Sequence, residues 1–530
     1  MSHLEPGRAT ASRVTMATLQ ERSYRNYAAR TAVIDGDRSL TYAELGERVH
    51  RVASGLLAAG MSRGDRGVIL LDNCPEYFAI DQALFLGGFV RVAISTRLHL
   101  REVVHILADC GATTIFTSPD WAERIAAERA GLPALKLLVA DRPAAADVTL
   151  ADLLAQGSPE PPSEWPRPED PAALLYTSGT TGVPKGATLS HANWLAMVRN
   201  AMVELPVVTS ADVVLHAAPL SHLSGYIGPV YVATGAAHLA VPKFSPETVL
   251  DLIRAHQVTV LPMVPTMLNL LLLAAESSPH EYPTLRTIVY AGSPIAPDRL
   301  IRARAVFGDV FVQFYGLSET PLPLSCLSAE DHTFDPDGSP PARLASAGRV
   351  SPFVELRIVA RDGSEAGPGE VGEIVVRTDT TMIGYWGRPE ATAQMIDADG
   401  WARTGDLGRL DSDGYLTIVD RLKDMVITGG YNVYPNEVEQ AISTLAAVQE
   451  VAVIGVPDET WGEALLAFVV VRDAHQLTPE EVIGACTANL ASYKKPRHVE
   501  FVAALPRTGS GKLRKRDLRE RYWPADGRLV

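Results

Sequence analysis

Residues 176–186 read YTSGTTGVPKG and combine five hydroxyl side chains, three glycines and one lysine. Glycine lets backbone N–H groups approach phosphate oxygens closely, Ser and Thr hydroxyls add donors, and Lys185 adds a positive charge. The apolar residues 172–176 predict a short buried strand that leads into this segment. The composition favours a loop that wraps a polyphosphate over an ordinary surface turn rich in Ser, Thr and Gly. Lys185 follows Pro184 and precedes Gly186, so the Gly-Lys-Ser/Thr order of a Walker loop is absent and a P-loop kinase or ATPase is disfavoured.

Length and composition limit the class of protein. A chain of 530 residues is too long for a single core and predicts two or more domains. Its content of 47% hydrophobic and 21% charged residues is typical of soluble globular proteins. The formal net charge of −14 disfavours a general binder of nucleic acid or of anionic membranes.

Neither the N-terminus nor the most apolar stretch of the chain predicts a membrane segment. The N-terminal residues lack the apolar run of a secretory signal, so we expect a cytoplasmic protein. The most apolar stretch, residues 258–275, contains Pro262 and Pro265 and predicts a buried strand followed by a helix. The four cysteines form no CxxC pair and are expected to be reduced core residues, without a zinc site or a disulfide: Cys74, Cys110, Cys326 and Cys486.

The order of apolar patterns predicts an α/β architecture. Short apolar strands, at residues 66–71, 114–117, 258–264 and 287–290, alternate with helical patterns such as residues 42–59. Such alternation favours α/β layers with largely parallel sheets.

After about residue 363 the pattern changes to short β-rich phrases, followed by helical stretches at residues 436–445 and 479–490. This predicts a small α+β unit attached to a larger one. The charged segment 420–424 (DRLKD) suits a solvated hinge between them.

Seven segments resemble, in their order, the adenylate-forming superfamily that contains the acyl-CoA synthetases. The similarity spans residues 41–518 and rests on YTSGTTGVPKG at 176, PLSHLSG at 219, YAGSP at 290, QFYGLSET at 313, RTGDLG at 403, DRLKDMVITGGYNVYPNEVE at 420 and PRTGSGKLRKRDL at 506.

The resemblance implies a fold and a reaction. The expected fold is α/β, with a large multi-layer N-terminal domain (residues 1–421) that adds a small β-barrel-like part to its α/β layers. A small mobile α+β domain (residues 422–530) follows, with its hinge near Lys423. The expected reaction uses ATP and Mg²⁺ to convert a carboxylic acid to acyl-AMP and pyrophosphate, after which the thiol of coenzyme A displaces AMP.

Roles for individual residues follow from the same resemblance. Lys512 bridges the acyl carboxylate and the α-phosphate, where an ammonium neutralises developing charge. Glu319 ligates Mg²⁺, a cation that prefers oxygen ligands. Ser318 stands where the family usually has Thr and keeps the hydroxyl that reaches the α-phosphate. The β- and γ-phosphates are held by Thr177, which also acts in catalysis, with Ser178, Gly179, Thr180, Thr181 and Lys185.

The remaining nucleotide contacts are implied in the same way. Tyr315, followed by Gly316, stacks on adenine, and Asp406 accepts both ribose hydroxyls, which Arg421 also reaches. The base pocket is lined by Ala291, Gly292 and Ser293. Rotation of the small domain about Lys423 would then bring a thiol channel into place, bordered by Gly429, Gly430 and Tyr431.

The resemblance also indicates which acid is activated. The acyl pocket would be formed by His222, which gates it and shifts between the two steps, with Gly225, Gly292, Phe314 and Leu317. The block HLSGYIG has no acidic residue to pair with an ammonium, so a non-amino acid is favoured. Phe314 stands where related aryl ligases commonly carry Gly, and a ring there shortens the pocket toward a small or flat acid.

Several alternatives remain open at this stage. Taken singly, Glu319 fits a surface charge, Lys512 a basic tail and His222 a structural core residue. The acyl group could pass to a carrier-protein phosphopantetheine or to a nitrogen nucleophile instead of coenzyme A. A catalytically idle nucleotide-binding protein is disfavoured because Glu319, Asp406 and Lys512 are all present. We expect a monomer or homodimer, and no nucleic-acid partner.

Overall fold

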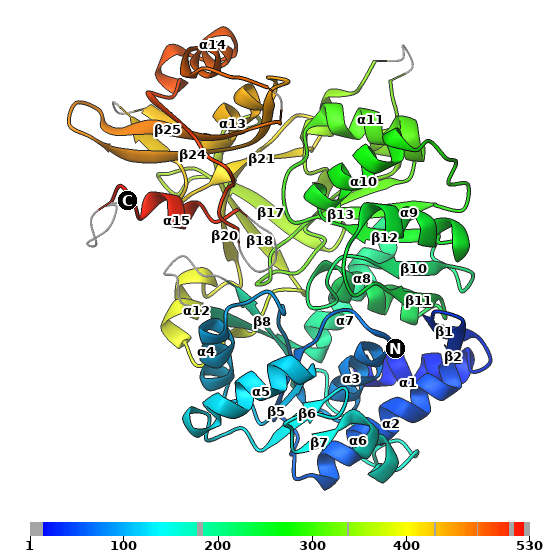
Figure 1. Ribbon diagram of the computed structural model, residues 1–530. Helices are drawn as coiled ribbons and strands as arrows, with labels where there is room; N and C mark the ends of the chain where they lie inside the picture. Colours follow the sequence, from blue (N-terminus) through cyan, green and yellow to red (C-terminus); the bar gives the residue numbers. More distant parts are fainter. Residues whose placement is uncertain are drawn as a thin grey trace, which may run out of the picture.

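The computed structural model describes residues 14–177, 184–335, 339–428, 431–473, 475–507 and 513–523, and at Thr177 it describes the backbone alone. Two parts follow one another along the chain (Figure 1). The large lobe contains the elements up to β21 (Leu416–Arg421), and the small lobe those from β22 (Val426–Thr428) onward. The predicted α/β class with a large and a small part is confirmed.

The first sheet of the large lobe has nine strands in the order β16-β15-β14-β13-β12-β10-β11-β1-β2. The run from β1 to β14 is parallel, and β2, β15 and β16 pair antiparallel at the two edges. Its strands are β1 (Thr31–Asp35), β2 (Arg38–Thr41), β10 (Val213–His216), β11 (Ala237–Ala240), β12 (Val260–Met263), β13 (Thr287–Ala291), β14 (Phe311–Tyr315), β15 (Ser325–Leu327) and β16 (Arg349–Val350).

The second sheet has eight strands in the order β19-β9-β8-β4-β3-β5-β6-β7. Its interior strands are buried along most of their length because both faces are covered. The eight strands of this sheet are β3 (Arg66–Leu70), β4 (Val90–Ala93), β5 (Thr114–Thr117), β6 (Leu137–Ala140), β7 (Val148–Thr149), β8 (Pro171–Thr177), β9 (Lys185–Ser190) and β19 (Gly384–Tyr385).

Helices form three layers around these two sheets. One cluster of buried side chains joins α7 and α8 to strands of both sheets, so these helices lie between the sheets. Separate clusters place α9, α10 and α11 against the outer face of the first sheet and α4 and α5 against the second. The helices of the large lobe are α1 (Met16–Asn26), α2 (Tyr42–Ala58), α3 (Pro75–Leu86), α4 (Leu100–Cys110), α5 (Pro119–Glu128), α6 (Leu150–Gln156), α7 (His191–Glu204), α8 (Leu223–Val232), α9 (Pro246–Ala255), α10 (Pro265–Ser277), α11 (Pro297–Phe307) and α12 (Pro389–Met395).

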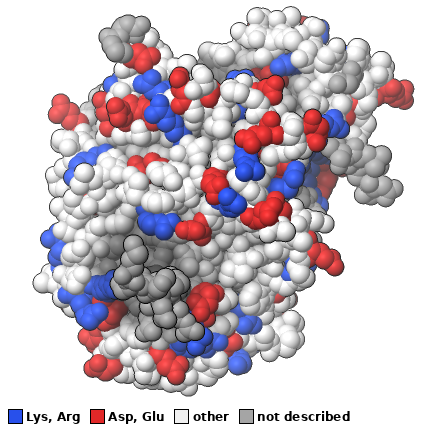
Figure 2. Space-filling view, turned by 180° about the vertical axis from the view of Figure 1, so that it is seen from behind, with Lys and Arg blue, Asp and Glu red and all other residues white. Residues whose placement is uncertain are grey.

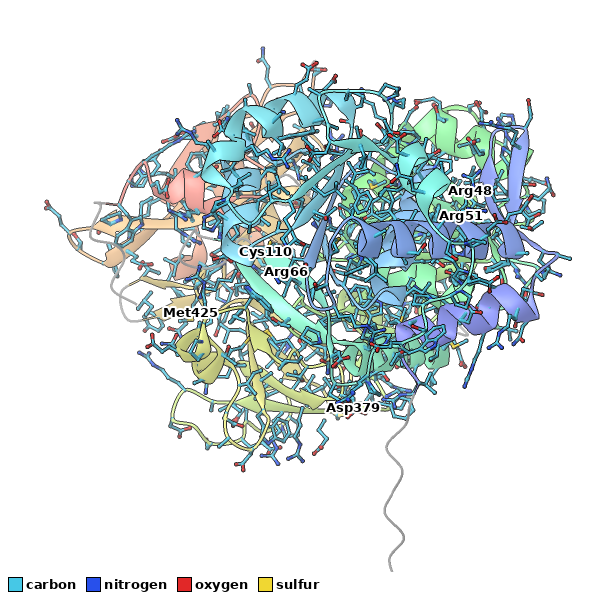
Figure 3. All side chains as sticks on the ribbon, turned by 90° about the horizontal axis from the view of Figure 1, so that it is seen from below. Arg48, Arg51, Arg66, Cys110, Asp379 and Met425 are labelled. Carbon is cyan, nitrogen blue, oxygen red and sulfur yellow. The ribbon has the colours of Figure 1, made fainter. Side chains whose placement is uncertain are left out.

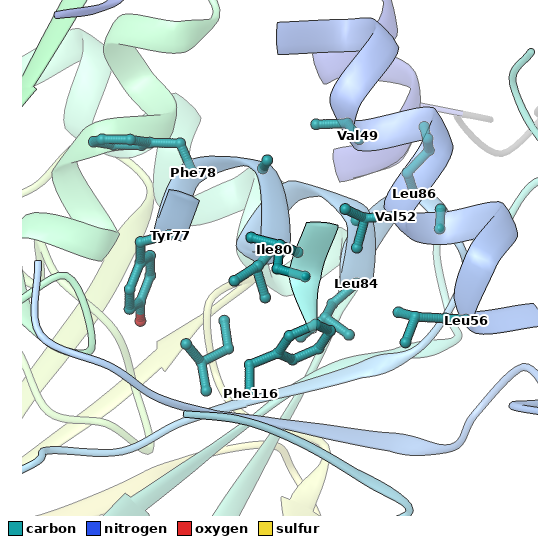
Figure 4. Close-up of a cluster of buried hydrophobic side chains, with 14 of the residues drawn as sticks. Val49, Val52, Leu56, Tyr77, Phe78, Ile80, Leu84, Leu86 and Phe116 are labelled. Atoms are coloured by element: carbon teal, nitrogen blue, oxygen red, sulfur yellow. The ribbon is translucent and has the colours of Figure 1, made fainter. Parts of the chain in front are cut away.

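The packing of α2 on α3 illustrates how the sequence builds these layers. Thr41 begins α2 with a capping box, in which its backbone N–H donates to Glu44 Oε2 at 2.7 Å. Val49, Val52 and Leu56 then recur at helical spacing along one face, and Figure 4 shows them against the side chains of α3 and Phe116 of β5.

The end of the large lobe is the predicted β-rich part. It is a four-stranded antiparallel sheet in the order β17-β18-β20-β21, and this path is open, so the expected likeness to a barrel does not extend to closure among the described residues. The sheet uses β17 (Val354–Val359), β18 (Gly372–Thr378) and β20 (Ala402–Leu410) with β21.

The small lobe packs two helices on one antiparallel ladder. β24 (Val448–Asp458) pairs with β25 (Gly462–Val471), and the predicted helices appear as α13 (Pro435–Ser443) and α14 (Pro479–Asn489). The remaining elements are β23 (Tyr431–Val433), β26 (His498–Phe501) and α15 (Lys515–Arg519). The predicted α+β character of this part is confirmed.

The apolar stretch and the cysteines also match their sequence predictions. Residues 258–275 form β12 and most of α10, as expected, and no helix among the described residues is long and apolar enough to cross a membrane. All four cysteines are free, and three of them are buried. On the face seen in Figure 2, basic and acidic side chains are interspersed.

A buried ion pair, which the sequence patterns do not reveal, joins the second sheet to the helices between the sheets. Arg91 of β4 has a side chain only 1% exposed, and its guanidinium bonds to Asp81 of α3. The guanidinium also lies 5.3 Å from the Trp194 ring centroid of α7, and donates to the Leu220 carbonyl before α8 at 3.3 Å. Burial raises the pKa of Asp81, and the Arg91 charge partly offsets that shift.

We predict that Arg91→Met lowers the free energy of unfolding by about 3–5 kcal/mol, because it leaves the Asp81 carboxylate buried without its cation. The double variant Arg91→Met/Asp81→Leu should recover most of this loss. Urea unfolding of the single and double variants measures both values. Equal destabilisation by the two variants would show that the loss comes from packing and not from the unpaired charge.

Candidate active site

Three side chains predicted to contact a nucleotide converge where the first sheet meets the four-stranded sheet. Tyr315 ends β14, and its Oη donates to Asp406 Oδ2 of β20 at 2.8 Å. Asp406 Oδ1 lies 3.4 Å from Arg421 Nε, because Asp406 and Arg421 are register partners in the β20–β21 ladder. Asp406 is only 6% exposed, whereas the Arg421 side chain is 51% exposed. Tyr315 and Arg421 thus contact the two carboxylate oxygens of Asp406, and the Arg421 guanidinium remains accessible to solvent.

The burial of this cluster changes the pKa of Tyr315. Burial raises the pKa of Tyr315 well above its usual value, and the neighbouring Asp406 charge raises it further. The hydroxyl therefore stays protonated and serves as a donor at neutral pH.

The turn after Tyr315 brings its backbone close to a later segment. A Cβ at Gly316 would lie 2.7 Å from Leu322 Cα, so only glycine fits there without a shift. Half-buried Leu317 and Ser318 follow. Burial raises the pKa of Tyr226 of α8, and the nearby Arg91 charge and Ser318 hydroxyl partly offset that rise. The turn thus joins β14 to the helix layer.

Glu319, the predicted metal ligand, is held by a segment that the sequence did not point to. Its Oε1 accepts a hydrogen bond from Tyr385 Oη at 2.8 Å, and its carbonyl accepts one from the Met382 N–H at 2.8 Å. The Lys185 Nζ lies 5.3 Å from the centroid of the same Tyr385 ring. Glu319 and Lys185 are therefore neighbours through Tyr385, although 134 positions separate them in the chain (319 − 185).

The predicted phosphate loop connects two strands of one hairpin. β8 and β9 pair antiparallel, with Thr177 opposite Lys185 and Tyr176 opposite Gly186. The strand expected at residues 172–176 is confirmed, and the return strand β9 was not foreseen. Ser178, Gly179, Thr180 and Thr181 lie outside the described residues.

The segment predicted to line the base pocket follows the strand next to Tyr315. Ala291 ends β13 and is the register partner of Phe314, while Gly292 (φ +93°) and Ser293 are exposed beyond the strand. Phe314 is only 1% exposed, within the cluster that joins α7, α8 and both sheets. The ring is a fixed apolar wall at the end of the first sheet.

The predicted acyl gate begins helix α8. His222 is the N-cap of α8, and its Nδ1 lies 2.8 Å from the Ser221 hydroxyl. Gly225 lies in the first turn, where a Cβ would come within 2.0 Å of the Leu220 carbonyl oxygen. The Asn73 side chain fixes this region, because it donates to the carbonyls of residues 216 and 218 and accepts from the Leu220 N–H at 2.8 Å.

The predicted hinge residue lies where the chain leaves the large lobe. Lys423 is in the turn between β21 and β22, and the neighbouring Asp424 bonds to Arg519 of α15. Tyr431 is 57% exposed and stacks on Tyr493 with centroids 4.6 Å apart. Gly429, Gly430 and Lys512 lie outside the described residues.

One contact ties the C-terminal segment to the large lobe. Arg514 Nη2 lies 3.6 Å from Glu102 Oε1 in α4, and both side chains are 35% exposed. Arg514 is two positions after Lys512 in the chain.

Two observations bear on other candidate sites. A cavity between α1, α3 and α8, lined among others by Tyr77, Asp81 and His238, includes none of the predicted site residues. Among the residues described, no group of three or more His, Cys, Asp or Glu side chains could hold a metal ion by itself.

Comparison with known proteins matches both lobes. The family model "AMP-binding enzyme" matches residues 20–386, and "AMP-binding enzyme C-terminal domain" matches residues 437–512. The chain belongs to the AMP-binding enzyme family. The predicted resemblance to the adenylate-forming acyl-CoA synthetases is thereby confirmed.

Named relatives in this family align with the chain over nearly its full length. The chain is 39% identical to a feruloyl-CoA synthase from an Amycolatopsis species, over 93% of this chain and 96% of that one. It is 35% identical to the indoleacetate–CoA ligase of Aromatoleum aromaticum, over 93% and 95%. The structure of ATP-bound MatB from Rhodopseudomonas palustris aligns with a TM-score of 0.85 at 32% identity, covering 96% of this chain and 99% of that one.

We predict that Tyr315→Phe lowers the free energy of unfolding by about 1–3 kcal/mol, because the buried Asp406 carboxylate loses a donor. Tyr522→Phe is the matched control, since the Tyr522 hydroxyl also bonds a carboxylate, that of Glu500, but at a more exposed position. Its effect should stay below about 1 kcal/mol. Urea unfolding measures both, and equal effects would mean that burial of Asp406 does not set the loss.

Proposed function

We propose that this acyl-CoA synthetase activates a flat aromatic carboxylic acid. In the first step a carboxylate oxygen attacks the α-phosphorus of ATP, the bond to the β-phosphate breaks, and pyrophosphate leaves. In the second step the sulfur of coenzyme A attacks the acyl carbon, the bond to AMP breaks, and the thiol proton is lost. The observation that carries the adenylation part of this proposal is the convergence of Tyr315, Asp406 and Arg421 within one cluster.

That cluster suits the nucleoside half of ATP. A buried carboxylate already oriented by Tyr315 can accept hydrogen bonds from both ribose hydroxyls without first losing a water shell. Arg421, half exposed beside it, adds donors for the same sugar. The exposed glycine after Ala291 leaves room for the flat base to approach the backbone, with Tyr315 as its stacking partner.

Residues next to this cluster would bind the phosphates of ATP. Lys185 and the residues from Thr177 to Thr181 hold the β- and γ-phosphates, and Ser318 reaches the α-phosphate. Glu319 offers one carboxylate, and one or two carboxylates together with substrate phosphates are the usual ligand set of Mg²⁺. The chemistry that Mg²⁺ supplies when bound is neutralisation of charge on the phosphate oxygens.

Phe314 favours a small or flat acid over a long chain, and the names of two relatives favour an aromatic one. A buried ring at the end of β14 limits the depth of a pocket that also uses His222, Gly225, Gly292 and Leu317. The feruloyl-CoA synthase and the indoleacetate–CoA ligase carry aromatic acids in their names. Both are CoA ligases by name, which favours coenzyme A over a carrier protein or an amine as acceptor.

Alternation of the two domains, residues 1–421 and 422–530, about Lys423 completes the proposal. Lys512 acts only if its segment reaches the large lobe, and the ion pair of Arg514 with Glu102 is a contact of this kind. Rotation after the first step would then present the loop of Gly429, Gly430 and Tyr431 to the acyl adenylate.

We expect ATP–pyrophosphate exchange with ferulate, cinnamate or indoleacetate to exceed exchange with palmitate by at least ten-fold, because the Phe314 ring blocks a long chain. Isotope exchange over this panel measures it. Palmitate as the best acid would refute the aromatic assignment, and exchange with no acid would refute adenylation itself. With the best acid, product analysis against coenzyme A, a phosphopantetheinyl carrier protein and an amine identifies the acceptor.

Lys512→Ala should lower acid-dependent pyrophosphate exchange by at least 100-fold, since no ammonium then offsets the charge of the two reacting anions. Thioester formation from supplied acyl-AMP should change less than three-fold, because the second step uses another face of the small domain. Lys243→Ala, at an exposed loop position, is the control. Loss of both half-reactions in Lys512→Ala would contradict domain alternation.

A further inference from the structure

We propose that Tyr385 is a positioning residue that holds Glu319 and Lys185 in one fixed arrangement for metal and phosphate binding. This inference rests on the proposed function, which assigns the metal to Glu319 and phosphates to Lys185. None of the seven segments on which the family resemblance rests includes Tyr385. The inference rests on the contacts of residues 382–388, a segment called the strap below.

The backbone of the strap links Glu319 to the strand after the phosphate loop. The Met382 N–H donates to the Glu319 carbonyl at 2.8 Å, which fixes the first end. The Trp386 N–H donates to the Gly186 carbonyl at 2.8 Å, next to Lys185. Between these points β19 pairs antiparallel with β9, with Tyr385 opposite Ala187. The main chain therefore places Tyr385 between the two functional groups.

The Tyr385 side chain then contacts both groups. Its hydroxyl donates to Glu319 Oε1 at 2.8 Å, and its ring centroid lies 5.3 Å from Lys185 Nζ. A hydrogen bond to a carboxylate orients it, and the ring face attracts an ammonium. Glu and Lys side chains are flexible and lose rotamer freedom on ordering. One half-buried tyrosine thus restrains the carboxylate and the ammonium together.

The far end of the strap is anchored to the strand before the loop. Arg388 Nη2 donates to Asp109 Oδ1 at 2.6 Å, and Tyr176 Oη donates to Asp109 Oδ2 at 2.7 Å. The Arg66 guanidinium lies 5.5 Å from the Trp386 ring and donates to the Cys110 carbonyl at 2.7 Å. Figure 3 labels Arg66 and Cys110 side by side. The strap is therefore fixed to both flanks of the predicted phosphate loop.

The geometry separates positioning from packing. When a residue that hydrogen-bonds to a metal ligand is removed, the metal affinity typically falls 10- to 100-fold. The substitution Tyr385→Phe removes such a hydrogen bond and keeps the ring. The fold at this point also has backbone bonds that Tyr385→Phe leaves intact. A purely structural role predicts a change in stability alone.

The chain offers a closely matched control in Tyr415. Its hydroxyl donates to the Asp331 carboxylate at 2.6 Å, and its ring lies 4.6 Å from the Arg349 guanidinium carbon. Tyr415 therefore has the same two kinds of partner as Tyr385, but at a place with no assigned role. Tyr415→Phe reports what loss of such a hydroxyl does to the fold.

The test measures Mn²⁺ binding in the presence of a non-hydrolysable ATP analogue, by electron paramagnetic resonance and by calorimetry. We expect Tyr385→Phe to raise the Mn²⁺ dissociation constant about ten-fold. Tyr415→Phe should leave it within two-fold of the wild type. Urea unfolding of both variants should give similar midpoints, and the KM for the acid should be unchanged in Tyr385→Phe.

A double-mutant cycle with Glu319→Gln decides whether Tyr385 acts through Glu319. If it does, Tyr385→Phe adds less than two-fold to the loss that Glu319→Gln causes by itself. Full additivity of the two losses, or Mn²⁺ binding in Tyr385→Phe equal to the wild type, overturns the proposal. Absence of Mn²⁺–nucleotide binding in the wild type would instead overturn the proposed function.

Discussion

The burial of the Asp406 carboxylate is the constraint on which the arrangement of the large lobe depends. A charged group that is only 6% exposed is costly to remove from water unless hydrogen bonds and an opposite charge surround it. The donors come from different elements, Tyr315 at the end of β14 and Arg421 on β21. The first sheet and the four-stranded sheet must therefore meet at one place, and the nucleotide contacts gather there.

A similar principle operates deeper in the lobe. Arg91 and Asp81 form an ion pair in the layer between the two large sheets, and Arg91 also touches Trp194 and the turn before α8. Asn73, which follows β3, fixes the same segment with three hydrogen bonds. Polar groups thus set the position of α8 within an otherwise apolar layer, and α8 provides two of the residues expected at the acyl pocket, His222 at its N-cap and Gly225 in its first turn.

Much of this architecture could be predicted because its signals are local. The strand before the phosphate loop, the helix beginning at Tyr42 and the two helices of the small lobe follow from short apolar patterns and caps. The seven motifs identified the superfamily. The bond between Tyr385 and Glu319 could not be foreseen, because 66 positions separate the partners in the chain and nothing in the sequence around Tyr385 pointed to Glu319. The pairing of Arg91 with Asp81 was hidden because a charged residue in a strand ordinarily indicates an exposed position.

The contact between Arg514 and Glu102 has a consequence for how the two lobes are held. Both side chains are one-third exposed, and such surface ion pairs contribute about 0–1 kcal/mol and weaken as ionic strength rises. By contrast, the well-enclosed pair of Asp424 and Arg519 joins two segments that both follow β21, so it does not link the two lobes. The ion pair between Arg514 and Glu102 therefore opposes separation of the C-terminal segment from α4 by no more than about 1 kcal/mol, and added salt lowers even this contribution.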